Sequence, residues 1–258
     1  MKILIKLGGT LLDGEETRAS IAGQLREVLA ANPELECVVV HGGGRQMTRF
    51  LAERGVESSF VRGLRVTTPE VVDAVLQVFT GTVNRGLVAS LIAAGIPAVG
   101  LSGIDACLVE AEQLDPELGA VGRPVRSNPA VLEALLASGF LPAVACVAGD
   151  RSGNIYNVNA DQMAVACAAG FEADKLFFLT DVDGVRDGEG RVIGRLSAAE
   201  ATTLIEQGVA TGGMQAKLES ASAALAEGLA EVVIAPGAAP DVIARLLAGE
   251  GLGSRVTP

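Results

Sequence analysis

Segments typical of buried strands alternate with segments typical of helices along nearly the whole chain. The strand segments are short apolar runs, which we expect at Lys2–Leu7, Cys37–His41, Ala98–Leu101, Leu141–Val147, Lys175–Thr180 and Glu231–Ile234. We expect helices at Thr17–Ala31, Arg45–Arg54, Pro69–Phe79, Thr82–Ala94, Pro129–Ser138, Ala160–Ala169, Ala198–Gln207, Met214–Gly228 and Pro240–Leu247. This alternation predicts an α/β fold, a three-layer αβα sandwich around a mostly parallel open sheet. Ligands of such sheets bind beyond the carboxyl ends of the strands.

One stretch, residues 105–126, departs from the alternation. It contains two short β-like pieces, Cys107–Ala111 and Gly119–Arg126, which suggest hairpins over the edge of the sheet. The sequence shows no internal repeat, low-complexity linker or appended domain. We therefore expect one large domain or two closely joined lobes.

Charge and composition exclude several classes of protein. The formal net charge is −11, and no basic stripe that could replace the counterions of a nucleic acid is visible. The apolar start of the chain is too short for a signal peptide, and no stretch approaches the ~20 apolar residues of a membrane span. The four cysteines lie far apart in apolar stretches, which indicates buried thiols rather than a metal or redox site. We expect a cytoplasmic protein.

Two glycine-rich segments follow buried strands directly. In Lys6-Leu7-Gly8-Gly9 a strand ends in a lysine and two glycines, either a ligand loop or a plain turn. In His41-Gly42-Gly43-Gly44 the glycines stand between a strand and a helix, where backbone N–H groups and the helix N-terminus favour an anion. Neither segment is a dinucleotide fingerprint or a P-loop. His41 is the only histidine, and we interpret it as structural.

Lysine is rare in this chain, with 4 lysines against 16 arginines. Arginine evidently meets the ordinary need for surface cations, so each lysine is more often expected where a compact point charge is required. Lys6 and Lys217 both lie beside glycine-rich segments, the second being Thr211-Gly212-Gly213-Met214-Gln215-Ala216-Lys217. We interpret both lysines as phosphate ligands, although Lys217 could equally be an exposed helix residue.

Two polar clusters lie at the ends of predicted strands or the starts of helices. Asn157-Val158-Asn159-Ala160-Asp161 stands at the mouth of a helix, where it could cap the helix or face a ligand. Thr180-Asp181-Val182-Asp183-Gly184-Val185 follows an apolar strand and suggests a turn near a nucleotide or Mg²⁺, although solvated turn chemistry explains it equally well.

In order and spacing these segments resemble the amino acid kinase superfamily over essentially all 258 residues, and most resemble its kinases of N-acetyl-L-glutamate. The resemblance is carried by KLGG at Lys6–Gly9, VVHGGG at Val39–Gly44, GLRVT at Gly63–Thr67, GTVN at Gly81–Asn84, NVNADQ at Asn157–Gln162, TDVDGV at Thr180–Val185 and GGMQAK at Gly212–Lys217. One departure is Ala106, where many relatives carry glycine.

The resemblance implies a role for each matched residue. Lys6 and Lys217 would flank the transferring phosphoryl group, and Asp161 would hold both lysines. The acyl substrate would contact Gly43, Gly44, Arg65, Asn157 and Asn159. The phosphates and the nucleotide would contact Gly8, Gly9, Gly42, Asp181, Val182, Asp183, Gly184, Val185, Arg186, Val209, Ala210, Thr211 and Gly213. Residues 1–173 would bind the acyl substrate and form the dimer, and residues 174–258 would bind the nucleotide.

The implied reaction moves the γ-phosphoryl group of ATP, with Mg²⁺ bound to the nucleotide, onto a carboxylate in arginine biosynthesis. A Glu-like acceptor with a pKa near 4.3 is already ionised at neutral pH and needs no general base. Catalysis would then depend on positioning and on positive charge. We expect no protein metal site.

Other readings remain open at this point. The chain could phosphorylate an aminoadipate or glutamate attached to a carrier protein, or act as a nucleotide or amino-acid sensor. Aspartate kinases would normally bring regulatory domains, and uridylate kinases would not be expected to pair GLRVT with NVNADQ. In relatives that arginine inhibits, a helix before the first strand links dimers into rings. Here the first expected strand begins at residue 2. The resemblance therefore also implies a homodimer, built on residues 69–94, with little inhibition by arginine.

Overall fold

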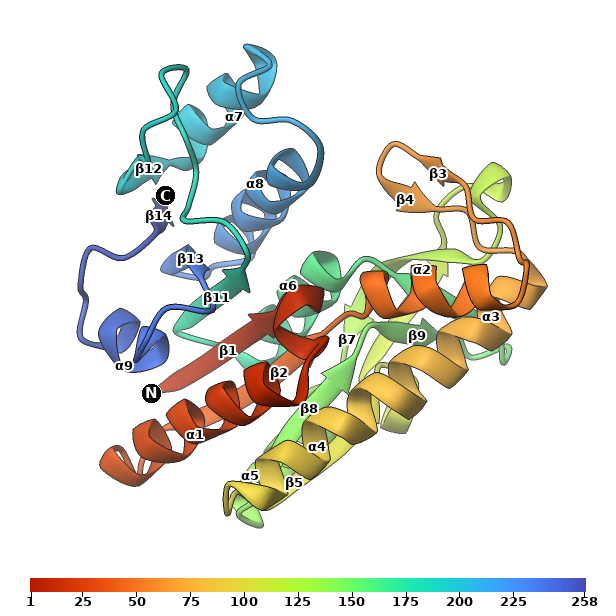
Figure 1. Ribbon diagram of the computed structural model, residues 1–258, viewed down its shortest axis with the longest axis horizontal. Coiled ribbons are helices and arrows are strands. Elements are labelled where there is room, and N and C mark those ends of the chain that lie inside the picture. The colour runs from red at the N-terminus through yellow and green to blue at the C-terminus, as the bar shows by residue number, and fades with distance from the viewer.

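The computed structural model describes residues 1–258 and contains one eight-stranded sheet, in the order β12-β14-β13-β11-β1-β2-β8-β5 (Figure 1). All neighbouring pairs are parallel except β13 with β14. The strands are β1 (Lys2–Leu7), β2 (Glu36–His41), β5 (Ala98–Ser102), β8 (Leu141–Ala145), β11 (Lys175–Thr180), β12 (Arg195–Ser197), β13 (Glu231–Pro236) and β14 (Ser254–Thr257). The predicted mostly parallel sheet is confirmed.

Helices cover both faces of this sheet. The chain forms α1 (Glu15–Ala31), α2 (Gly44–Glu53), α3 (Pro69–Val75), α4 (Asn84–Ala93), α5 (Ala130–Ala137), α6 (Ala160–Phe171), α7 (Ala198–Glu206), α8 (Gly212–Ala226) and α9 (Val242–Leu247). Helix α1 packs against α4 and α9, whereas α6 packs against α8. Right-handed crossovers place α1 and α6 on opposite faces, because the connection from β1 to β2 and the connection from β8 to β11 cross the sheet in opposite directions.

The core lies between these layers and is centred on β1 and β11. Ile3, Leu4 and Ile5 of β1 are fully buried, as are Phe177 and Phe178 of β11. Strands covered on both faces read as continuous apolar runs, which is why the sequence indicates them so clearly. The carboxyl ends of the central strands therefore have a rigid foundation.

The two helices expected at Pro69–Phe79 and Thr82–Ala94 form one continuous helix, Pro69–Ala93, so that prediction is wrong. The middle of this helix, Leu76–Val83, is π-helical and links α3 to α4. The helix has 25 residues and is long and apolar enough to span a membrane by length and composition alone, contrary to our expectation. It packs against β5 and β8, and its Val75, Leu87 and Leu91 are buried, which accounts for its apolar composition.

The two β-like pieces expected at Cys107–Ala111 and Gly119–Arg126 form an antiparallel pair of strands, and two further strands that the sequence did not predict join them. Strands β6 (Val109–Gln113), β7 (Val121–Ser127), β9 (Val147–Gly149) and β10 (Ile155–Val158) close into a small barrel. The expected strand Leu141–Val147 breaks at Cys146, where the chain passes from the main sheet into this barrel. A hairpin of β3 (Phe60–Val61) and β4 (Leu64–Arg65) and the 3₁₀ turns Gly9–Leu12, Asp105–Cys107 and Pro116–Leu118 complete the fold.

One of the four cysteines departs from expectation. Cys37, Cys146 and Cys167 are buried free thiols, and burial raises the pKa of each to about 12. Cys107 is also free, but it is exposed in a 3₁₀ turn with a positive φ of 54°. The apolar neighbours in its sequence belong to the adjacent strand, so they do not bury it.

Candidate active site

Three loops meet at the carboxyl edge of the sheet because the strands before them are neighbours. In the register of the sheet, Leu7 of β1 lies beside His41 of β2 and beside Leu179 of β11. The loops that follow these strands are Gly8-Gly9, Gly42-Gly43 and the turn after Thr180. This is the edge at which a parallel sheet binds ligands.

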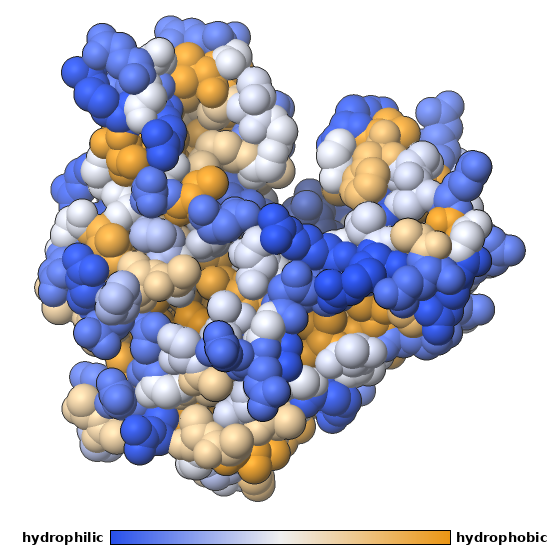
Figure 2. Space-filling view, in the orientation of Figure 1, coloured by the Kyte–Doolittle hydropathy of each residue, from blue (hydrophilic) through white to orange (hydrophobic).

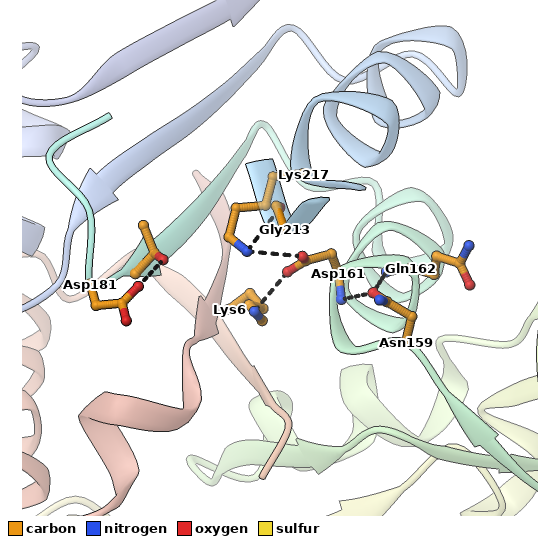
Figure 3. Close-up of polar contacts among 8 residues, drawn as sticks. Lys6, Asn159, Asp161, Gln162, Asp181, Gly213 and Lys217 are labelled. Carbon is orange, nitrogen blue, oxygen red and sulfur yellow. Dashed lines mark hydrogen bonds and ion pairs between the residues drawn. The ribbon is translucent and has the colours of Figure 1, made fainter. Parts of the chain in front are cut away.

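One carboxylate pairs with both candidate lysines at this edge (Figure 3). Lys6 Nζ lies 2.7 Å from Asp161 Oδ1, and Lys217 Nζ lies 3.4 Å from Asp161 Oδ2. Lys6 comes from the end of β1, Asp161 from the first turn of α6 and Lys217 from the second turn of α8. The fold thus brings together three residues that are distant in the sequence.

This cluster carries one net positive charge. Burial would raise the pKa of Asp161, but the charges of Lys6 and Lys217 outweigh burial and lower the pKa below its ordinary value. Asp161 is therefore ionised, and the two lysines share a single counterion. Lys6 is only 7% exposed, so its ammonium group acts on a ligand through little water.

The glycines of the second loop are needed for space and for backbone contacts. A Cβ on Gly43 would lie 2.9 Å from Phe79 Cδ1, and a Cβ on Gly42 would lie 3.1 Å from Ala160 Cβ. Gly44 begins α2, so the first N–H groups of that helix point toward the loop without intrahelical partners. The loop therefore presents donors to an anion.

Gly8 serves a different purpose from the one expected. Its N–H donates to Leu179 O at 2.8 Å and so is not free to cradle a phosphate. A Cβ on Gly8 would lie 3.1 Å from the same oxygen, which explains the glycine by close strand contact. The adjacent Gly9 opens a 3₁₀ turn, and its carbonyl accepts a hydrogen bond from Gln46 Nε2 at 3.2 Å.

Arg65 is a buried guanidinium without a carboxylate partner. Its Nη2 donates to Thr48 Oγ1 at 2.7 Å and to Gly44 O at 3.3 Å, its Nη1 donates to Ser58 Oγ, and its Cζ lies 4.5 Å from the centre of the Phe60 ring. Burial lowers the pKa of Arg65 from its ordinary value. A buried cation held by neutral groups alone favours an incoming anion.

The two asparagines of the first polar cluster have different surroundings. Asn157 Nδ2 donates to Thr67 Oγ1 at 3.1 Å, which ties β10 to the segment that follows Arg65. Asn159 caps α6, because its Oδ1 accepts from Asp161 N at 2.8 Å and from Gln162 N at 3.3 Å. The cap leaves only the amide nitrogen of Asn159 for a ligand.

Three of the candidate nucleotide residues lie in the turn that follows β11. In the view of Figure 3, Asp181 lies on the opposite side of Lys6 from Asn159, and Thr180 Oγ1 donates to its Oδ1 at 3.2 Å. Asp183 pairs with Arg186 at 3.1 Å on the surface, and Val182 is 37% exposed between these two acids.

Of the other candidate nucleotide residues, some use their backbone N–H groups in hydrogen bonds within the protein, and others lie at the start of α8. Val185 is fully buried, with its N–H on Ser254 Oγ, and a Cβ on Gly184 would lie 2.6 Å from that oxygen. The N–H groups of Val209 and Ala210 both donate to Leu204 O. Thr211 is the N-cap residue of α8, and Gly213 lies in its first turn, where its carbonyl accepts from Lys217 Nζ at 3.5 Å.

A groove of about 610 Å³ is lined by the β3–β4 hairpin, β7, α6 and α8, and Figure 2 shows the notch between the hairpin and the part of the surface that carries α8. None of Lys6, Asp161 and Lys217 lines this groove. Its walls include Arg62, Arg126, Asn159, Ala216 and Glu219, so it reaches the neighbours of Asp161 and Lys217. The structure contains no group of three or more His, Cys, Asp or Glu side chains that could hold a metal ion.

His41 is structural, as we predicted, and it has a partner that the sequence did not reveal. The ring is fully buried, with Nδ1 2.8 Å from Gly42 O and Nε2 2.9 Å from Asn84 Nδ2. Burial lowers the pKa of His41 to about 4. Asn84 lies in the GTVN segment, but nothing local in the sequence connects that segment with His41.

Comparison with known proteins identifies one family over nearly the whole chain. The model of the amino acid kinase family matches residues 1–236. An acetylglutamate kinase of Solibacter usitatus (strain Ellin6076) is 62% identical over 256 residues, which are 99% of each chain. An acetylglutamate kinase of Aeromonas salmonicida (strain A449) is 41% identical, over 99% of this chain and 98% of that one.

A solved structure is also similar over its full length. The crystal structure of smu.665 from Streptococcus mutans UA159 is 28% identical, has a TM-score of 0.85 and aligns over 99% of this chain and 98% of that chain. Sequence and fold agree, and the chain therefore belongs to the amino acid kinase family, in which the two relatives above are acetylglutamate kinases.

Proposed function

We propose that this chain transfers the γ-phosphoryl group of ATP to the γ-carboxylate of N-acetyl-L-glutamate, as a step of arginine biosynthesis. The observation that carries the proposal is the ion-pair cluster in which Lys6 and Lys217 share Asp161. Two cations on one counterion leave a net positive charge where the anionic phosphoryl group must pass. Such fixed charge stabilises the transition state of phosphoryl transfer.

The acceptor would lie between Arg65 and the glycine loop. The unpaired guanidinium of Arg65 suits the α-carboxylate, because its planar fork can donate two parallel hydrogen bonds. The γ-carboxylate would approach the N–H groups of Gly43 and Gly44, and the amide groups of Asn157 and Asn159 would contact the rest of the molecule. Because the attacking carboxylate is already ionised, no side chain has to remove a proton.

The nucleotide would bind to residues 174–258, and the acyl substrate would bind mainly to residues 1–173. The mouth of α8 at Thr211–Gly213 offers N–H groups to a phosphate, and Gly9 and Gly42 would contact the phosphates from the ends of β1 and β2. Mg²⁺ would arrive with the nucleotide, held by phosphate oxygens, with Asp181 as the nearby carboxylate. The ion neutralises charge on the β- and γ-phosphates when it is bound.

We propose a cytoplasmic homodimer in which the helix Pro69–Ala93 and strand β5 form the interface. Strand β5 is an edge of the main sheet, and Ile92 on the adjacent helix is 57% exposed. Unpaired edge strands and exposed apolar side chains favour association. Light scattering tests this interface, and the Ile92→Glu variant should shift the protein to monomers.

The activity is tested by trapping the acyl phosphate as a hydroxamate. Purified protein, ATP, Mg²⁺ and hydroxylamine are incubated in parallel with N-acetyl-L-glutamate, L-glutamate, L-aspartate and N-acetyl-L-aspartate. Hydroxamate with N-acetyl-L-glutamate alone supports the proposal. A product with another acid would change the substrate, and binding of ATP without any product would favour a carrier-linked acceptor or a sensor.

A further inference from the structure

A relay of side chains runs from helix α4 to the glycine loop, and its Asn84 and His41 are fully buried. Arg85 Nη2 donates to Asn84 Oδ1 at 2.7 Å, and Asn84 Nδ2 donates to Ala143 O at 2.8 Å. Each of these contacts fixes the orientation of the Asn84 amide, because Arg85 can only donate and a carbonyl oxygen can only accept. The second hydrogen of Asn84 Nδ2 therefore points at His41 Nε2, 2.9 Å away.

The amide in turn determines which nitrogen of His41 carries the proton. Since Asn84 donates to Nε2, that nitrogen must be an acceptor, and the single proton of the neutral ring lies on Nδ1. Nδ1–H then donates to Gly42 O at 2.8 Å. Room for the relay is built into the neighbouring strand, because a Cβ on Gly100 of β5 would overlap Asn84 Oδ1.

The carbonyl that His41 holds belongs to the peptide unit that carries the N–H of Gly43. This peptide is trans, so the C=O and N–H bonds point in opposite directions. With Gly42 O held against His41, Gly43 N–H must point away from the imidazole. Gly43 is buried, yet its N–H makes no hydrogen bond within the protein. Buried N–H groups without partners are rare, and such a group indicates a ligand.

Arg65 of β4 contacts the same loop, because its Nη2 donates to the carbonyl of the next residue, Gly44. From these contacts we propose that His41 and Asn84 are positioning residues that aim the Gly43 N–H at the carboxylate of the acceptor. The inference rests on the proposed function, since it assumes that the acceptor binds between Arg65 and this loop. Neither residue touches the reacting atoms.

Two substitutions of His41 separate positioning from packing. The amide nitrogen of His41→Asn can occupy the place of Nδ1–H and donate to Gly42 O, whereas the amide of His41→Gln reaches the place of Nε2, toward Asn84. Both replace a buried ring by a smaller polar group, so both should lower stability. We expect His41→Asn to keep the KM for N-acetyl-L-glutamate within a few-fold of wild type, and His41→Gln to raise it roughly tenfold or more.

Binding of MgATP is the internal control for the effect of these variants on the acceptor KM. The affinity for MgATP, measured by nucleotide binding, should be unchanged in both His41 variants. Leu87→Ala is the matched control, because Leu87 is fully buried in the same helix and makes no contact in the relay. It should lower the melting temperature without changing the acceptor KM. Equal effects of His41→Asn and His41→Gln on this KM would overturn the proposal.

The tautomer can be measured directly and does not depend on the variants folding. Because His41 is the only histidine, the imidazole ¹⁵N spectrum of the untagged protein reports this ring alone. We expect a proton on Nδ1 and none on Nε2 at neutral pH. A proton on Nε2 would overturn the relay even if the enzyme is active, whereas a wild-type protein that forms no hydroxamate would overturn the proposed function instead.

Discussion

Lys6 and Lys217, from opposite ends of the chain, bind the two oxygens of one carboxylate, that of Asp161. This arrangement keeps the two ammonium groups on different oxygens of the carboxylate, with both at the carboxyl edge of the sheet. It also makes the site dependent on three elements at once, namely β1, α6 and α8.

Asp161→Asn should reduce kcat roughly 100-fold or more, because the variant leaves the buried ammonium group of Lys6 and the partly buried one of Lys217 without their counterion and free to move apart. Steady-state hydroxamate assays measure the effect. Glu189→Gln is the control, since its ion pair with Arg191 lies on the surface and should contribute little. An Asp161→Asn enzyme with wild-type kcat would contradict the role of the shared counterion.

Lys6→Ala and Lys217→Ala should each lower kcat far more than they change the KM of either substrate. The reason is that their charge matters most where negative charge spreads in the transition state. Initial rates at varied ATP and varied acceptor give both constants. A fully active Lys217→Ala enzyme is the outcome that would remove this lysine from the mechanism.

Arg65→Lys should raise the KM for N-acetyl-L-glutamate roughly tenfold or more and leave the KM for ATP unchanged, because an ammonium group cannot reproduce the two-pronged hydrogen bonding of a guanidinium. Arg62→Lys is a matched control from the same hairpin, where the Arg62 side chain is 79% exposed. Similar changes in both variants would indicate a general effect of charge rather than recognition of the acceptor.

Gly43→Ala should destabilise the protein by about 1–3 kcal/mol, because the new methyl group would press on Phe79. The backbone conformation of Gly43 does not disfavour alanine, since its φ is 178° and any residue adopts that value. Denaturant unfolding measures the loss. Gly44→Ala is the control for stability, since a Cβ there meets no atom within 4 Å. Phe79→Leu in the Gly43→Ala background should recover part of the loss.

Stability should fall as the pH drops from 6.5 toward 4, and His41 should cause most of the fall above pH 5. The pKa of His41 is lowered from 6.5 to about 4 in the folded protein, so only the unfolded chain binds the proton in this window. The folded state therefore loses up to on the order of 3 kcal/mol as the pH decreases. Unfolding free energies of wild type and His41→Asn, compared between pH 5 and 7, check this, since the variant should lack the slope.

The central strands could be predicted from the sequence, whereas several edge elements could not. Strand β11, LFFL between polar ends, is buried on both faces and so consists of apolar residues. Strand β14, SRVT, is short and mixed in character, and only its pairing with β12 and β13 makes it a strand. The polar residues around Gly81 suggested a break in the helix, but the structure accommodates them in a π-helical segment.

The site residues could be proposed from motifs that follow strands, because the fold brings strand ends together. The motifs could not show which backbone N–H groups are already hydrogen-bonded within the protein. Gly8 belongs to a glycine pair that suggests a phosphate loop, yet its N–H bonds to Leu179. Asn84 could not be assigned a role, because its contact with His41 depends on how α4 packs across the sheet.

The π-helical segment determines where the helix Pro69–Ala93 can change its length. Phe79 and Val83 lie on it against Gly43, and Asn84 follows it directly. Removing one residue from the α-helical part Pro69–Val75 would rotate Asn84 by about 100° relative to the start of the helix and turn it away from His41. Removing one residue between 76 and 83 converts the wide π-helical turn to α-helix and keeps both ends in register, so natural variation in residue count should be confined to that segment.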